Sequence, residues 1–107
     1  MLQIRSDVRV PTPHKYALRL AKHFEHRVAV QRLQQPYRID FPDAPCEIDF
    51  TDELIHIHIQ AVSSETLARV REVVVRHLKQ VASQETFAIA WSGDLPADAV
   101  ADQGRPS

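Results

Sequence analysis

Two pairs of histidines stand at spacings that could bring imidazole rings together. His23 and His26 are three positions apart in the stretch KHFEHR, and His56 and His58 alternate with isoleucine in LIHIHIQA. Three positions are close to one helical turn, whereas two positions separate neighbours on one face of a strand. Imidazole can ligate a transition metal or change its charge near neutral pH. Whether each pair lies on a helix or on a strand therefore determines whether its rings can share a ligand or a proton.

The N-terminal part of the sequence predicts a strand followed by a helix. Residues 3–10 alternate apolar and polar side chains, which is typical of a strand. A helix is expected over residues 13–26, with Thr12 as its N-cap and Pro13 at the first helical position, where a missing N–H costs nothing. The apolar stripe expected on this helix consists of Tyr16, Ala17, Leu20 and Phe24.

The middle of the sequence predicts a series of short strands. They cover residues 28–33, 37–41, 46–50 and 54–61, and two of them could be one bent strand. The last of these alternates most regularly. Its inward side chains are expected to be Ile55, Ile57 and Ile59, and its outward ones His56, His58 and Gln60.

A second helix and a final strand complete the predicted domain. The helix runs from a Ser63 cap to about Ala82, and the strand covers residues 86–91. One apolar face on each strand predicts a mostly antiparallel sheet with both helices on one face, an α+β two-layer sandwich of order β-α-β-β-β-β-α-β. We expect one domain over residues 1–92 and a loosely ordered tail over residues 93–107.

Composition excludes several classes of protein. A formal net charge of -1 argues against a nucleic-acid partner, and no apolar stretch approaches the roughly 20 residues that span a bilayer. With two glycines in 107 residues, a glycine-rich phosphate loop is not expected. A single cysteine and the absence of an apolar leader predict a cytoplasmic protein without membrane partners.

Three donor residues are expected to face the layer between helices and sheet. His23 follows Leu20 by three positions, His77 lies within the stripe of the second helix, and Cys46 alternates inward. With His26 at the rim, this set suits iron, another transition metal or haem. The alternative is that the buried histidines bond to backbone carbonyls or carboxylates and that the cysteine packs as a small hydrophobe.

The remaining candidates predict less chemistry. His56 and His58 stand about 6.5–7 Å apart on an outward strand face, which indicates an ordinary solvated surface more than a metal site. Cys46 with His77 is a conceivable nucleophile and base, but an inward strand position does not activate a thiol.

The same residues resemble a bacterial family of about 100 residues, the domain of unknown function 2218, over residues 4–92. The matching residues are Tyr16, His23, Phe24, His26 and Arg27, then Arg38, Ile39, Asp40, Phe41, Pro42 and Cys46, and finally His77, Leu78, Glu85 and Trp91. Pro36, Pro45 and the run QVASQE depart from the family pattern. The resemblance implies no established activity, and it implies a likeness to accessory proteins of bacterial iron or siderophore uptake.

We therefore expect a binding or accessory protein more than an enzyme. The first expectation is a module that binds a protein partner or forms a homodimer through a sheet edge or the tail. The alternative is a binder of iron, haem or a small metabolite that uses His23, His26, Cys46 and His77. A small enzyme with the same residues is the third alternative.

Overall fold

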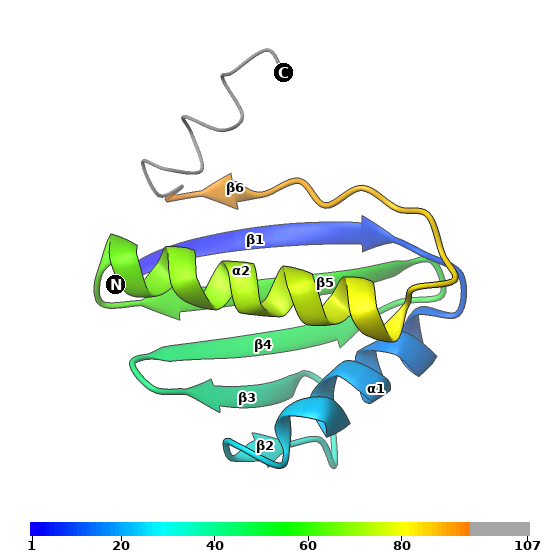
Figure 1. The fold of residues 1–107 in the computed structure, drawn as a ribbon, viewed down its shortest axis with the longest axis horizontal. Coiled ribbons are helices and arrows are strands. Elements are labelled where there is room, and N and C mark those ends of the chain that lie inside the picture. Colours follow the sequence, from blue (N-terminus) through cyan, green and yellow to red (C-terminus); the bar gives the residue numbers. More distant parts are fainter. Residues whose placement is uncertain (95–107) are drawn as a thin grey trace.

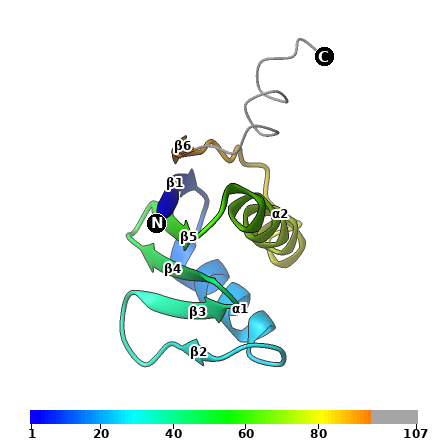
Figure 2. The ribbon, with the colours of Figure 1, turned by 90° about the vertical axis from the view of Figure 1, so that its left-hand side faces the viewer.

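The computed structural model describes residues 1–94 of the chain. Its elements in order are β1 (Leu2–Arg9), α1 (Pro13–Phe24), β2 (Val30–Gln31), β3 (Tyr37–Phe41), β4 (Ala44–Phe50), β5 (Leu54–Ala61), α2 (Ser64–Val81) and β6 (Ser92–Gly93). The six strands form one sheet of order β2-β3-β4-β5-β1-β6, in which neighbours are antiparallel. Both helices cover the same face of this sheet (Figure 1 and Figure 2). The predicted fold class and element order are confirmed.

Alternation along the central strands explains why this sheet has one covered and one open face. In β5 the isoleucines Ile55, Ile57 and Ile59 are buried, whereas His56 and His58 are partly exposed on the other side. Strand β4 repeats the pattern, because its register places inward side chains opposite those isoleucines. The core therefore lies between this face and the helices, and side chains on the open face meet water.

Helix α1 begins as predicted and ends two residues early. Thr12 is the N-cap, but its backbone is left-handed (φ 46°) and its hydroxyl bonds to the carbonyl of Pro11 instead of capping the helix. The buried residues are Pro13, Tyr16, Ala17, Leu20, Ala21 and Phe24. Pro13 and Ala21 are buried in addition to the predicted residues, so the buried stripe is wider than the predicted one.

Helix α2 matches its prediction closely. The Ser63 hydroxyl accepts a hydrogen bond from the Thr66 backbone N–H at 3.2 Å, as an N-cap should. The buried stripe is Leu67, Val70, Val74 and Leu78. Within residues 1–94, neither helix is long and apolar enough to cross a bilayer.

The predicted strand over residues 86–91 is wrong. Phe87, Ile89 and Trp91 do alternate inward and pack against the core, but the segment forms no ladder with β1. Its backbone is held by the Ser6 hydroxyl, which donates to the carbonyl of Ala90 at 2.7 Å. Ladder pairing begins only at Ser92 and Gly93, which lie opposite Arg5 and Ile4.

The start of the predicted tail lies within β6. Gly93 pairs with β1, and Asp94 bonds to Gln3 through its backbone N–H and its carboxylate at 2.8 and 3.0 Å. Residues 95–107, the rest of the predicted tail, lie outside the described residues. Upstream of β6, Glu85 accepts a hydrogen bond of 2.6 Å from the Tyr16 hydroxyl, which ties this segment to α1.

Candidate functional site

A groove with a basic rim lies where the C-terminal end of α1 meets α2. Its volume is about 620 Å³. The lining side chains are His23, Phe24, His26, Arg27 and Val28 from α1 and the segment after it, Phe41 from β3, and Val73, Arg76 and His77 from α2. Among these described lining residues, five are basic or can become so, four are apolar and none is acidic.

Aromatic rings form much of the groove wall. The rings of His23 and His77 lie 4.5 Å apart, centroid to centroid. Phe24 packs edge-on against Phe41 at 4.9 Å and against His77 at 5.0 Å, with interplanar angles of 79° and 62°. Tilted and edge-to-face arrangements at these separations are favourable for aromatic pairs. The walls are therefore packed in the absence of any ligand.

The prediction that His23 is buried is wrong. His23 is exposed, as is His26, and His77, which was also expected to be buried, is only half-buried. The cause is the width of the buried stripe on α1, because Ala21, which the prediction left out, is fully buried and moves the centre of the stripe away from His23. At about 100° per residue, His23 then falls at the margin of the stripe. His77 lies at the corresponding margin of α2, so the two rings meet at the surface between the helices.

The hydrogen bond of His77 defines which of its nitrogens is available. Its Nδ1 lies 2.6 Å from the carbonyl oxygen of Val73, so Nδ1 carries the hydrogen and donates it. The predicted backbone partner for this histidine is thereby confirmed. In the neutral ring, Nε2 keeps a lone pair that can accept a hydrogen bond or a proton.

Burial and nearby positive charge both disfavour protonation of His23 and so lower its pKa. Burial, and then the neighbouring His77, His26 and Arg27, lower the pKa of His23. A negative charge placed in the groove would oppose the last three causes and raise that pKa. The groove is therefore more receptive to an anion than to a cation.

Cys46 lies apart from this groove. It is fully buried in β4, as predicted, opposite Ile39 and Ile59, and burial raises its thiol pKa to about 12. It is not among the side chains that line the groove. Within the part of the chain that the structure describes, no three His, Cys, Asp or Glu side chains are grouped so that they could hold a metal ion. A metal site that combines His23, His26, Cys46 and His77 stays a prediction.

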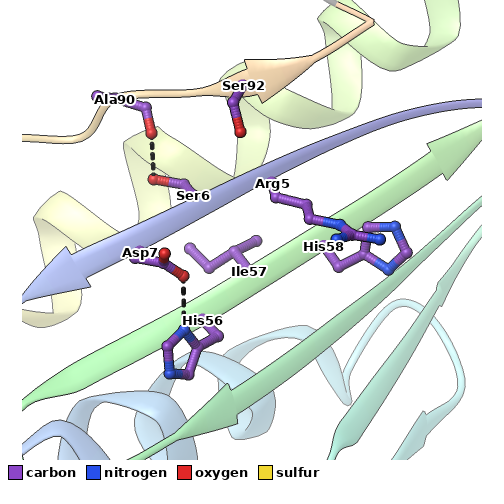
Figure 3. A pocket seen from close by; sticks show the side chains of 8 residues that line it. All are labelled: Arg5, Ser6, Asp7, His56, Ile57, His58, Ala90 and Ser92. Carbon is purple, nitrogen blue, oxygen red and sulfur yellow. Dashed lines mark hydrogen bonds and ion pairs between the residues drawn. The ribbon is translucent and has the colours of Figure 1, made fainter.

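A second pocket, of about 540 Å³, opens on the uncovered face of the sheet (Figure 3). Asp7 and His56 are direct cross-strand neighbours there, and the Asp7 carboxylate lies 2.5 Å from His56 Nδ1. His58 Nε2 lies 2.7 Å from the side-chain oxygen of Gln3, and its Nδ1 lies 3.6 Å from Glu47. Figure 3 shows the Arg5 side chain extending towards the His58 ring. Both histidines of this face thus already have partners on neighbouring strands.

Sequence reasoning missed Arg76 and the role of Phe41. A usable signal was present, because an arginine adjoins a histidine at both helix margins, in His26–Arg27 and in Arg76–His77. The pattern alone does not bring the two dipeptides together. That step needs the packing of α1 against α2, which places their ends on one groove.

Comparison with known proteins places the chain among small bacterial α+β domains. The family model described as "Uncharacterized protein conserved in bacteria (DUF2218)" matches residues 5–92. The chain belongs to this family, as the resemblance in its sequence predicted. The fold is similar to the NMR structure of PA4090 from Pseudomonas aeruginosa, with a TM-score of 0.74, 29% sequence identity, and coverage of 89% of this chain and 99% of that chain. No curated protein matches the chain.

Proposed function

We propose that this domain is a cytoplasmic bacterial binding protein whose ligand is a small organic anion with an apolar body. The observation that carries the proposal is the groove between α1 and α2. Its lining combines His23, His26, Arg27, Arg76 and His77 with an apolar wall, and none of its described lining residues is acidic.

The distribution of charge supports an anionic ligand. The chain as a whole has a formal charge of -1, so the positive character of the groove is local. Two arginines in one depression, with no acidic residue among its described lining residues, concentrate positive potential there, because low-dielectric walls focus the field. Guanidinium groups also match the geometry of carboxylate and phosphate oxygens.

The size and walls of the groove support a small ligand with an apolar part. A volume of about 620 Å³ lies within the range of roughly 300–1,000 Å³ typical of small-molecule sites. Phe24, Phe41, Val28 and Val73 offer apolar contact beside the charged groups. This mixture of apolar walls and a few polar groups is the usual composition of such sites.

The pocket on the open face is a weaker candidate for the same ligand. Its two histidines face carboxylates, with Asp7 at 2.5 Å from His56 and Glu47 at 3.6 Å from His58. An anion entering there would meet those negative charges. Like charges at close range oppose binding, and Arg5 is the one arginine that lines this pocket, against two in the groove, which favours the groove.

A protein partner at a sheet edge, the function first expected from the sequence, has less support. The edge strands β2 and β6 span two residues each. Short edge strands offer few unpaired backbone groups to an added strand. Catalysis has less support as well, because Cys46, the nucleophile considered, is fully buried and its thiol pKa is raised to about 12.

A transition metal such as iron is the second candidate ligand of the groove. The observation that favours it is the bond from His77 Nδ1 to the Val73 carbonyl, since metal-ligating histidines commonly orient their free nitrogen in this way. His23, whose ring centroid lies 4.5 Å from that of His77, is the candidate for a second ligand, with a usual metal–nitrogen distance of about 2.0–2.1 Å. Metal analysis of protein purified without a histidine tag tests this candidate, and metal-free protein that also fails to take up Fe(II) or Zn(II) would contradict it.

The test of the main proposal is a binding titration with two carboxylates, benzoate and octanoate. We expect at least one of them to bind the wild-type protein with one-to-one stoichiometry in calorimetry. Arg76→Gln removes a cation from the rim and should weaken that binding roughly tenfold, as expected for loss of a charged hydrogen bond. Arg69→Gln, a change at an exposed arginine two turns earlier on α2, is the matched control.

Equal affinity of wild type, Arg76→Gln and Arg69→Gln would contradict the proposal, as would the failure of both carboxylates to bind. Added salt should weaken binding to the wild type, because the charges at the rim are partly exposed and therefore screened.

A further inference from the structure

Arg27 and Arg76, the two arginines that line the groove, form no ion pair among residues 1–94. Other arginines of the surface do, since Arg9, Arg32 and Arg38 each bond to a carboxylate. A guanidinium group in a protein is always charged. Because no acidic residue stands among the described residues that line the groove, it has two permanent positive charges, which do not depend on its histidines.

The acidic residues nearest to these arginines in sequence do not cancel the two charges. Glu25, two positions before Arg27, is already paired with Arg32 at 3.0 Å. Glu72, one helical turn before Arg76, does not line the groove and forms no ion pair within the described part of the chain. Both guanidinium groups are therefore available to a ligand.

The two guanidinium groups are carried by separate elements. Arg27 follows the end of α1, whereas Arg76 lies on α2. A planar carboxylate can be satisfied by one guanidinium group, to which it bonds through both of its oxygens. A phosphate monoester has three terminal oxygens and close to two negative charges at neutral pH. It can therefore bond to both arginines, and its charge balances theirs.

On the basis of the function proposed above, we infer that the ligand is a small organic phosphate whose dianionic monoester group is held between Arg27 and Arg76. The organic part lies against the apolar wall, which includes Phe41 and Val73. Inorganic phosphate has no apolar part to place against that wall, so the groove discriminates against it. No covalent bond forms or breaks in this binding step.

The experiment compares phenyl phosphate with phenyl sulfate, which has a similar tetrahedral group but a single negative charge. Both are titrated into the full chain by calorimetry at about pH 8, well above the second pKa of a phosphate monoester, which is about 6. We expect the wild type to bind phenyl phosphate at least about tenfold more tightly than phenyl sulfate, because two charged hydrogen-bonding partners are engaged. Inorganic phosphate should bind at least about tenfold more weakly than phenyl phosphate, because it buries no ring.

Arg27→Gln and Arg76→Gln each remove one of the two cations. Both side chains are exposed, so both variants should fold. Each should weaken the binding of phenyl phosphate about tenfold. Each should also reduce the preference for phenyl phosphate over phenyl sulfate to about threefold or less, because one guanidinium group then serves either ligand. Arg69→Gln should keep the affinities and the preference of the wild type.

The preference is the decisive readout, because a variant that merely disturbed the groove would weaken both ligands alike. Equal binding of phenyl phosphate and phenyl sulfate, with benzoate still bound, would overturn this inference and leave the proposed function standing. A preference that is unchanged in both variants would overturn the placement of the phosphate between the two arginines.

Two further outcomes bear on the organic part of the ligand. Inorganic phosphate that binds as tightly as phenyl phosphate would overturn the claim that the apolar wall contributes. If phenyl phosphate, phenyl sulfate and benzoate all fail to bind, the proposed function fails together with this inference.

Discussion

The imidazole rings of His23 and His77 lie 4.5 Å apart at the surface, at the margins of two helices that pack on the same face of the sheet. Neither ring belongs to the fully buried core, and both line the groove between α1 and α2. The buried hydrophobic stripes of the two helices fix the helices on the sheet, and this places the two rings side by side. Because the rings are not needed for core packing, they can contact a ligand in the groove.

The lowered pKa of His23, caused first by burial and then by nearby positive charge, makes the stability of the fold sensitive to acid. The pKa of His23 is lowered from its ordinary value of 6.5, so in the pH range just below 6.5 the unfolded chain binds more protons than the folded one. The contribution of His23 to stability is therefore fully present above 6.5 and is lost as the pH falls through the lower, folded value. We expect the urea midpoint of the wild type to fall on acidification in this range.

His23→Gln should flatten this part of the pH profile, because glutamine does not titrate. His14→Gln is the control, since His14 is also exposed on α1 but lies at its N-terminal end and does not line the groove. If the urea midpoint depends on pH in the same way for wild type and His23→Gln between about pH 5 and pH 7, the lowered pKa of His23 is contradicted.

Cys46 should be inert in the folded protein. Its side chain is completely buried, and its pKa is raised from 9.0 to about 12, so little thiolate exists and reagents cannot reach it. We expect negligible reaction with a disulfide reagent such as dithionitrobenzoate under native conditions, followed by full reaction in guanidinium. Fast labelling of the native protein would contradict the burial of Cys46 in β4. It would also support thiol catalysis over the proposed binding function.

Gly93 should be required for the attachment of β6. Its backbone has φ 107°, and a Cβ built there would lie 2.5 Å from the carbonyl oxygen of Gln3. Gly93→Ala should therefore lower the free energy of unfolding by about 1–3 kcal/mol, the usual cost of a strained backbone position. Ser92→Ala, at the preceding exposed position, should change it by less than about 0.5 kcal/mol.

Chemical denaturation followed by the fluorescence of Trp91, the single tryptophan, measures this effect close to the site. An unchanged midpoint for Gly93→Ala would mean that β6 does not pair with β1 in solution.

Much of the fold was predictable because local patterns agree with it. The alternation in β5 and the Ser63 cap of α2 each specify their element without reference to the rest of the chain. The segment over residues 86–91 was not predictable in the same way. Alternation reports which side chains face the core, and it does not report whether the backbone pairs with a neighbouring strand.

The candidate site was predictable only in part. His77 and His23 were identified, but the predicted burial of His23 was wrong because the buried Ala21 widens the stripe of α1. Arg76 became relevant only once α2 was placed beside the end of α1. Residues at the edges of the buried stripes of two helices are hard to identify as site residues from the sequence, because only tertiary packing brings them together.

The most direct test of the account is to map where a carboxylate binds. In a ¹⁵N-labelled wild-type protein titrated with benzoate, we predict concentration-dependent shifts of the backbone amides of residues that line the groove, which on the two helices and the segment after α1 are His23, Phe24, His26, Arg27, Val28, Val73, Arg76 and His77. Amides around His56 and His58 on the open face should stay in place, although that face carries a pocket of similar size. Shifts confined to the open face, or no saturable shift in the groove, would contradict the claim that this domain binds organic anions between its helices.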